Sequence, residues 1–391
     1  MKNRSQSFLK QSSVILLFFC LTSLNGQAEI QNSFVKTLKD DAVFISMNSD
    51  QLLFYYENKV YLDDKVVYQN DSSKIIKVSS LKKGSNHAMV YLVKPASKSR
   101  HIFEIQFLKN LKYTGQSIAI NIPNDRSIPR QIISKNHILF LQPENQSYSV
   151  YDLIGEKQSD NSLFNNDYWS HEQSLLHSEY KGNHFLLGME TPFYHRDPNN
   201  VALFSLNETT FISERIRTIP LSKPDFFSIS KNGLFAIIGS SRQSSNTPQS
   251  FFLLLLELND PKNLTDIPLI ERPKFIQWND EKLYLIQSNQ IYIIDSATIH
   301  APLILPFTNQ FHPIQSFVHD RSVFIFGSKE IKVGQDGLKY QSIIVMEVDE
   351  EKLIEHIITN EIYDEIRLVP SVSGTDYFIQ ADTNLFHFII K

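Results

Sequence analysis

The sequence ISKNHILFL, residues 133–141, returns twice in this chain with small changes. ISKNGLFAI at 229–237 is close to it, and YKGNHFLL at 180–187 is a more divergent copy. Lys135 and Lys181 are 46 positions apart, and Lys181 and Lys231 are 50 apart. A recurrence at such a period predicts a chain built from structural repeats.

The same pattern continues toward the C-terminus with different residues. WNDEKLYLI at 278–286 and VHDRSVFIF at 318–326 each contain a strand end, a short polar turn and a strand of β-branched, aromatic and Leu residues. A second polar gap and a second strand follow each copy, as in QIYIID at 290–295. Because proline is excluded from the middle of sheets, the prolines that precede the copies mark the boundaries between repeats: Pro129, Pro224, Pro273 and Pro313.

Counting in both directions predicts eight hairpins, which begin near Leu52, Ala88, Ile138, Phe185, Leu234, Leu283, Val323 and Tyr377. Each unit of about 45 residues has room for four short strands, and no helical stripe of apolar residues is present. This pattern predicts an all-β fold, a β-propeller with eight blades. Seven blades is the alternative, because the first unit is compressed between Ala42 and Tyr68.

The two ends of the chain suggest how the ring closes. The last unit runs through 377–381 and 385–390 and leaves no residues for an outer strand before Lys391. The spare apolar stretch 33–38 precedes the first unit. We therefore expect an N-terminal strand, 33–38, to join the last blade beside 385–390, which protects the chain ends from fraying.

One stretch of the sequence resembles a known family. IYIIDSAT at 291–298 resembles the strand and turn of YVTN-type bacterial β-propellers, and the chain from about 33 to 391 resembles WD40/YVTN-like repeat proteins in its period. Trp278 is followed by Asn279, so the Trp-Asp dipeptide of WD40 repeats is missing there. The resemblance implies a propeller fold and partner binding on one face, while fold alone implies no particular function.

The first 28 residues have the features of a signal peptide. Lys2, Arg4 and Lys10 precede the apolar run 14–21, and small residues end at Ala28, where we expect cleavage. Residues 29–391 are then a single β-propeller domain. The apolar run is shorter than the roughly 20 residues of a transmembrane helix, and no later segment qualifies. The sequence thus predicts an exported protein with no transmembrane segment.

Net charge and cysteine content restrict the possible partners and the expected cellular location. Removing the three positive charges shifts the net charge from −4 to −7 (−4 − 3), which leaves no basic excess for nucleic acid. Cys20 is the only cysteine, so residues 29–391 contain none. A chain of this length buries a core without disulfides, and we expect a bacterial periplasmic or extracellular protein. A monomer is the default expectation.

Long connections on one face supply the candidate site. In a four-stranded blade, the loops from second to third strand share a face with the loops between blades. Long examples are expected at 189–200, 239–250 and 327–341, with a long blade-to-blade segment at 155–182. Extra loop length often carries function. The candidate partner-binding residues on this face are Trp169, His171, Tyr194, His195, Arg196, Asp197 and Arg242.

These residue types suit binding, although structural roles compete. Tyr194 and Trp169 could stack on a ligand, His195 could move a proton, and Arg242 could hold an anion. Alternatively, the segment 195–197 is a turn held by a local ion pair, and Trp169 pins its own loop to the disc.

The chemistry of the chain favours binding over catalysis. It has no Gly-rich phosphate loop, no His/Cys metal spacing and no G-x-S-x-G sequence, so we expect no cofactor or metal and assign no catalytic residue. The first hypothesis is an exported, non-enzymatic propeller that binds a protein or polysaccharide at its loop-rich face. The alternatives are a propeller hydrolase or lyase acting on a glycan or lactone, and a cell-envelope assembly scaffold.

Overall fold

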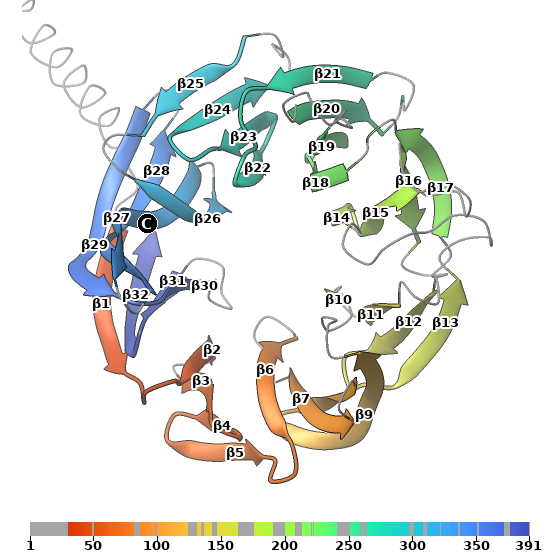
Figure 1. Ribbon diagram of the computed structural model, residues 1–391, viewed down its shortest axis with the longest axis vertical. Helices are drawn as coiled ribbons and strands as arrows, with labels where there is room; N and C mark the ends of the chain where they lie inside the picture. Colours follow the sequence, from red (N-terminus) through yellow and green to blue (C-terminus); the bar gives the residue numbers. More distant parts are fainter. Residues whose placement is uncertain are drawn as a thin grey trace, which may run out of the picture.

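The computed structural model describes residues 30–48, 51–81, 87–97, 100–123, 131–133, 137–142, 147–162, 176–190, 200–207, 213–219, 221, 223–240, 251–258, 260, 264–296, 301–307, 311–320, 322–334, 337–349, 352–370 and 376–390. Within these residues the strands form eight antiparallel sheets of four strands each. The sheets follow one another around a ring, as the blades of a β-propeller do (Figure 1). The predicted all-β, eight-bladed fold is confirmed.

The first four blades take up the N-terminal half of the chain. Blade 1 consists of β2 (Val43–Asn48), β3 (Gln51–Tyr56), β4 (Lys59–Leu62) and β5 (Lys65–Gln69). Blade 2 consists of β6 (Lys74–Ser80), β7 (Ala88–Ser97), β8 (Arg100–Lys109) and β9 (Lys112–Pro123). Blade 3 consists of β10 (Gln131–Ile133), β11 (His137–Gln142), β12 (Ser147–Asp152) and β13 (Lys157–Ser162). Blade 4 consists of β14 (Leu176–Tyr180), β15 (Asn183–Glu190), β16 (Asn200–Leu206) and β17 (Ser213–Ile219).

The remaining strands complete the ring. Blade 5 consists of β18 (Lys223–Ile229), β19 (Leu234–Ser240), β20 (Phe251–Glu257) and β21 (Leu264–Leu269). Blade 6 consists of β22 (Phe275–Asn279), β23 (Lys282–Ile286), β24 (Gln290–Asp295) and β25 (Leu303–Pro306). Blade 7 consists of β26 (His312–His319), β27 (Ser322–Gly334), β28 (Gly337–Asp349) and β29 (Lys352–Tyr363). Blade 8 consists of β30 (Ile366–Pro370), β31 (Asp376–Ala381), β32 (Asn384–Ile390) and β1 (Ile30–Thr37).

The eight predicted hairpins match the second strands of these blades, each of which begins at or within two residues of the expected position. The first unit, although compressed, forms a regular four-stranded blade from β2 to β5. This regular first blade is the reason that the alternative of seven blades is wrong.

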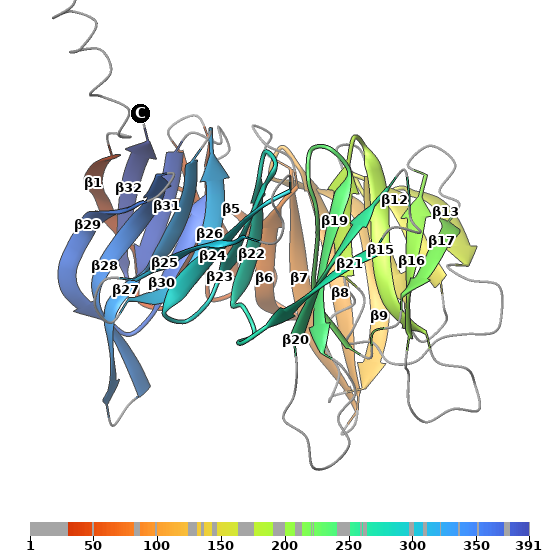
Figure 2. The same ribbon diagram turned by 90° about the horizontal axis from the view of Figure 1, so that it is seen from above.

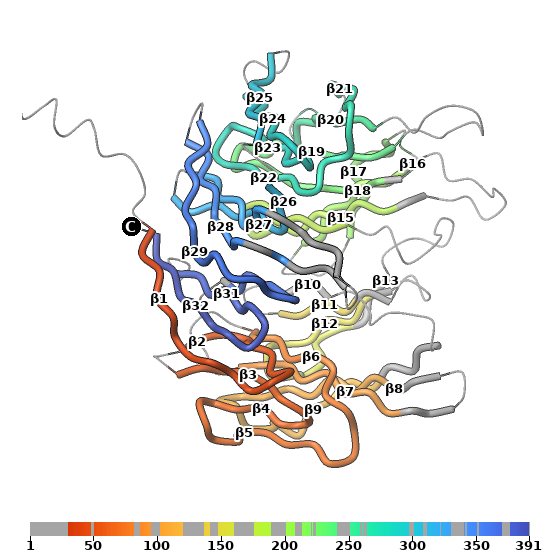
Figure 3. The backbone as a smooth tube through the Cα atoms, turned by 60° about the vertical axis from the view of Figure 1, so that its left-hand side comes forward, coloured from red at the N-terminus to blue at the C-terminus, as the bar shows by residue number. Residues whose placement is uncertain are grey.

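The ring closes through the N-terminal strand, as expected. β1 pairs antiparallel with β32, from Ile30 opposite Ile390 to Thr37 opposite Asn384 (Figure 3). Gln380 of blade 8 reinforces the junction with blade 1, because its Nε2 donates to the Ala42 carbonyl at 2.6 Å and its Oε1 accepts from the Phe44 N–H at 2.9 Å. Both ends of the described chain therefore lie on one blade.

The core lies between neighbouring blades. In β19, Phe235 and Ile237 pack against blade 4, while the alternate residues Ala236 and Ile238 pack against blade 6. A strand that is covered on both faces needs apolar residues at every position, which explains the continuous apolar runs of the repeats. Burying each large side chain of this kind stabilises the fold by about 1.5–3 kcal/mol.

Two predicted loops have a different structure. Residues 327–341, expected to be a long loop, form the outer half of the β27–β28 hairpin, with Gly334 opposite Gly337. The hairpin extends from the side of the disc opposite the C-terminus (Figure 2). The segment 155–182 contains β13 and β14 and is therefore not one continuous loop.

Candidate functional site

The repeated sequence forms the turn between the first and second strands of a blade. In blade 5, Gly233 has a φ of 83° and its N–H donates to the Ser230 carbonyl at 3.1 Å. The Ser230 hydroxyl oxygen also accepts from the N–H of Leu234 at 3.0 Å. In blade 6, Asp280 occupies the left-handed region with a φ of 50°, which Asp tolerates better than most residues. These local bonds fix the turns and the side chains they present.

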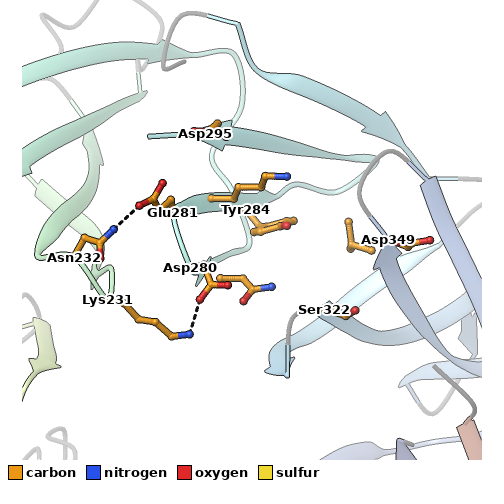
Figure 4. A pocket seen from close by; sticks show the side chains of 11 residues that line it. Lys231, Asn232, Asp280, Glu281, Tyr284, Asp295, Ser322 and Asp349 are labelled. Carbon is orange, nitrogen blue, oxygen red and sulfur yellow. Dashed lines mark hydrogen bonds and ion pairs between the residues drawn. The ribbon is translucent and has the colours of Figure 1, made fainter. Parts of the chain in front are cut away.

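A cavity of about 680 Å³ lies where the turns of blades 5, 6 and 7 meet. Its lining comes from the first turns of the three blades and from the ends of β24 and β28. Because adjacent strands are antiparallel, this face is opposite the one that carries the β27–β28 hairpin. Figure 4 shows the cavity between Lys231 and Asn232 on one side and Ser322 and Asp349 on the other.

Residues of the first turns of blades 5 and 6 interact across the blade boundary. Lys231 Nζ lies 2.5 Å from Asp280 Oδ1, and Asn232 Nδ2 donates to Glu281 Oε1 at 2.8 Å. In each of these two pairs the residues are 49 positions apart in sequence. The side chains of Lys231 and Asp280 are 75% and 56% exposed, so this pair forms the solvent-facing edge of the cavity.

The blade 7 side of the cavity rests on a buried carboxylate. Ser322, which lines the cavity, donates from its hydroxyl to Glu347 Oε1 at 3.2 Å. Glu347 is 1% exposed, and its other oxygen lies 3.4 Å from His356 Nε2. Asp349, also in the lining, pairs with Lys352 at 3.3 Å. The serine is thus held in place by its carboxylate acceptor.

The lining is polar nearly throughout. Of its eleven residues, Val348 is the only aliphatic one. Asn279 and Tyr284 also line the cavity but are largely buried, at 7% and 5% exposure. The arrangement offers hydrogen-bond donors and acceptors in close alternation, which suits recognition of a polar ligand.

Among the described residues, no group of three or more His, Cys, Asp or Glu side chains is arranged to hold a metal ion. The same part of the chain contains no helix with the length and apolar character needed to cross a bilayer.

The residues predicted from loop length lie outside the described part of the chain. Trp169 and His171 fall in 163–175, Tyr194, His195, Arg196 and Asp197 in 191–199, and Arg242 in 241–250. Their grouping on one face stays a prediction. The cavity itself was not predicted, although its turns were recognised as repeats. Opposite charges at equivalent positions of successive repeats, Lys231 and Asp280, are the signal that could have indicated it.

Comparison with known proteins supports the fold. No family model matches the chain, and no curated protein matches it in sequence. The solved structure of the Dos1 propeller is similar at a TM-score of 0.52 and 11% identity, covering 92% of this chain and 94% of that one. A crystal structure of a eukaryotic initiation factor also reaches a TM-score of 0.52, at 9% identity, with 92% and 91% covered. The RRP9 WD40 repeats give a TM-score of 0.44 at 9% identity, with 89% and 100% covered.

At these identities the likeness shows the fold alone. The chain is therefore a β-propeller. The narrower resemblance to WD40/YVTN-like repeat proteins stays a prediction.

Proposed function

We propose that this chain is an exported, non-enzymatic binding protein whose partner is a protein or a polysaccharide. The observation that carries the proposal is the cavity that three consecutive blades build from one repeated turn. Its volume of about 680 Å³ is in the range of pockets that hold a small ligand or a short segment of a larger one.

The state of the carboxylates supports binding over catalysis. Asp280 is paired with Lys231, and Glu281 accepts from the Asn232 amide. General acid–base chemistry with two carboxylates needs one group poised to give a proton and another free to accept one. Partners that already engage both groups favour a fixed recognition surface.

Export to the bacterial periplasm or exterior is part of the same proposal. Its support is the basic and apolar start of residues 1–28 and the lack of cysteine in 29–391. A role as a cell-envelope assembly scaffold would use the same binding property.

Capture from a cell-envelope extract tests the proposal and the face used. Wild-type protein is compared with Asn232→Trp, which places a bulky ring at the exposed edge of the cavity, and with the double variant Trp169→Ala/Tyr194→Ala. Glu214→Ala, which changes an exposed residue of β17, is the control. We expect Asn232→Trp alone to lose the captured partner.

Loss of the captured partner only in the double variant would place the binding site on the loop-rich face and contradict the assignment to the cavity. A wild-type protein that captures neither protein nor polysaccharide would contradict the proposed function. Circular dichroism of each variant checks that the fold is intact.

A further inference from the structure

The residues that line the cavity between blades 5, 6 and 7 also indicate the chemical class of its ligand. Resting on the proposed binding function, we infer that the cavity recognises a neutral, polyhydroxylated glycan segment. Three properties of the lining lead to this class: its small net charge, its mixture of donors and acceptors, and its few apolar side chains.

The lining carries a small excess of negative charge. Four carboxylates, Asp280, Glu281, Asp295 and Asp349, line the cavity together with two ammonium groups, Lys231 and Lys282. Lys352 adds a third cation beside Asp349, at 3.3 Å. A strongly charged peptide is attracted by a surface with a large excess of the opposite charge. The buried Glu347, which accepts from Ser322, adds a fifth carboxylate. Five negative groups against three positive ones leave an excess of two, which is not a strongly charged surface.

The donors and acceptors stand side by side. The Lys231 ammonium and Asp280 carboxylate are 2.5 Å apart, and the Asn232 amide and Glu281 carboxylate are 2.8 Å apart. A hydroxyl group both donates and accepts hydrogen bonds. Neighbouring hydroxyls of one sugar ring can therefore donate to a carboxylate while accepting from the ammonium or amide next to it. Hydrogen bonds that involve a charged partner are the stronger kind.

Apolar ligands find little surface in the cavity. Val348 is the one aliphatic lining residue, and the Tyr284 ring is 5% exposed because it packs into the core between blades 6 and 7. An acyl chain or an apolar peptide would have to desolvate ammonium and carboxylate groups without replacing their hydrogen bonds, which is costly. The volume of about 680 Å³ fits a short oligosaccharide stretch.

Isothermal titration calorimetry with defined probes tests this inference. The probes are cellohexaose, maltohexaose, hexa-N-acetylchitohexaose and, as the charged arm, a decalysine peptide. We expect at least one of the neutral oligosaccharides to bind, with an affinity that changes less than about twofold between low and high salt. Glu281→Ala should weaken that binding by about tenfold or more, because it removes an acceptor, whereas Glu214→Ala on β17 should leave it unchanged.

Binding of decalysine alone, falling steeply with salt, would overturn the inference, as would binding of no oligosaccharide. Equal binding by wild type and Glu281→Ala would do the same. The proposed function would still be supported after any of these three results if Asn232→Trp abolishes capture from envelope extract. Thermal unfolding of Glu281→Ala separates lost recognition from a lost fold.

Discussion

Lys231 and Asp280 each lie three residues before the first apolar residue of a second strand, Leu234 or Leu283, and their charged atoms meet at 2.5 Å across the boundary between blades 5 and 6. The pair shows how the repeat builds a surface. A turn that is only a connection in one blade becomes one wall of a cavity when its neighbour carries the complementary charge.

A double-mutant cycle of Lys231→Ala and Asp280→Asn should give a coupling free energy of only about 0.2–1 kcal/mol, because both side chains are largely exposed. Urea unfolding of the four proteins measures it. The coupling should shrink in about 1 M salt, where screening is strong. A coupling that is large and independent of salt would contradict the interpretation of this pair as a surface feature.

Gln380 should matter more for stability, since it joins the last blade to the first. Its amide bonds to the Ala42 carbonyl and the Phe44 N–H, and Arg367 also donates to the Phe44 carbonyl. Gln380→Ala should lower the free energy of unfolding by about 1–3 kcal/mol, because it leaves buried backbone groups without partners. The control is Gln158→Ala, whose amide donates to the nearby Glu156 carbonyl and which should be nearly neutral. Equal effects in chemical denaturation would argue against a special role for the junction.

Glu104 should give the fold a pH dependence on the acid side. Its bond to Lys94 at 2.8 Å, helped by one from Gln106 at 2.7 Å, holds the pKa of the carboxyl below its ordinary value of 4.5. A carboxyl whose pKa is lower in the folded state than in the unfolded chain stabilises the protein fully at pH values above its pKa in the unfolded chain. This contribution is lost as the pH falls through its pKa in the folded state.

Glu104→Gln should therefore cost about 1–2 kcal/mol near pH 7 and much less near pH 3. Unfolding measured across this range checks the sign. A cost that stays constant with pH would show that the ionised form is not what stabilises blade 2.

The fold could be predicted because burial on both sides of a strand leaves a clear trace. β19 and β23 appear in the sequence as unbroken apolar runs after a polar turn, and the same trace recurs in each blade. The outer half of the β27–β28 hairpin left no such trace, because its strands extend beyond the disc. Gly334 and Gly337, which pair at the end of this hairpin, were the local signal that it carried.

The cavity was harder to predict for a different reason. Glu281 and Asn232 are ordinary turn residues by themselves, and their significance comes from a contact between positions 49 apart. Ser322 and Glu347 likewise meet only because β27 and β28 pair in one register. Local sequence patterns identify turns but not which side chains share a space.

The loop-rich face keeps a prediction of its own. If a partner binds there, Trp169→Ala and Tyr194→Ala should each weaken binding by about 1–3 kcal/mol with little change in the thermal midpoint, as expected for interface anchors. If these residues only pin their loops, the midpoint should fall instead. Binding assays and thermal scans on the same preparations distinguish the two, and buried side chains at these positions would rule out the anchor role.

Tyr148 offers a substitution that should stabilise the protein. The residue is fully buried between blades 3 and 4, and its hydroxyl has no hydrogen-bond partner among the residues that the structure describes. Burial alone raises the pKa of this phenol to about 12. An unpaired buried hydroxyl loses its hydration without compensation, so Tyr148→Phe should be neutral or raise the free energy of unfolding by about 1 kcal/mol.

The matched control for this substitution is Tyr68→Phe. That hydroxyl donates to Gln106 Oε1 at 2.7 Å in a buried position and accepts from Asn70, so its removal should cost about 1–3 kcal/mol. Both variants delete one oxygen from a buried ring, and only the hydrogen bonding differs. Urea titration should therefore lower the midpoint of Tyr68→Phe, while the midpoint of Tyr148→Phe stays the same or rises. A clear loss of stability in Tyr148→Phe would mean that this hydroxyl has a partner in solution, for which an internal water is the simplest candidate.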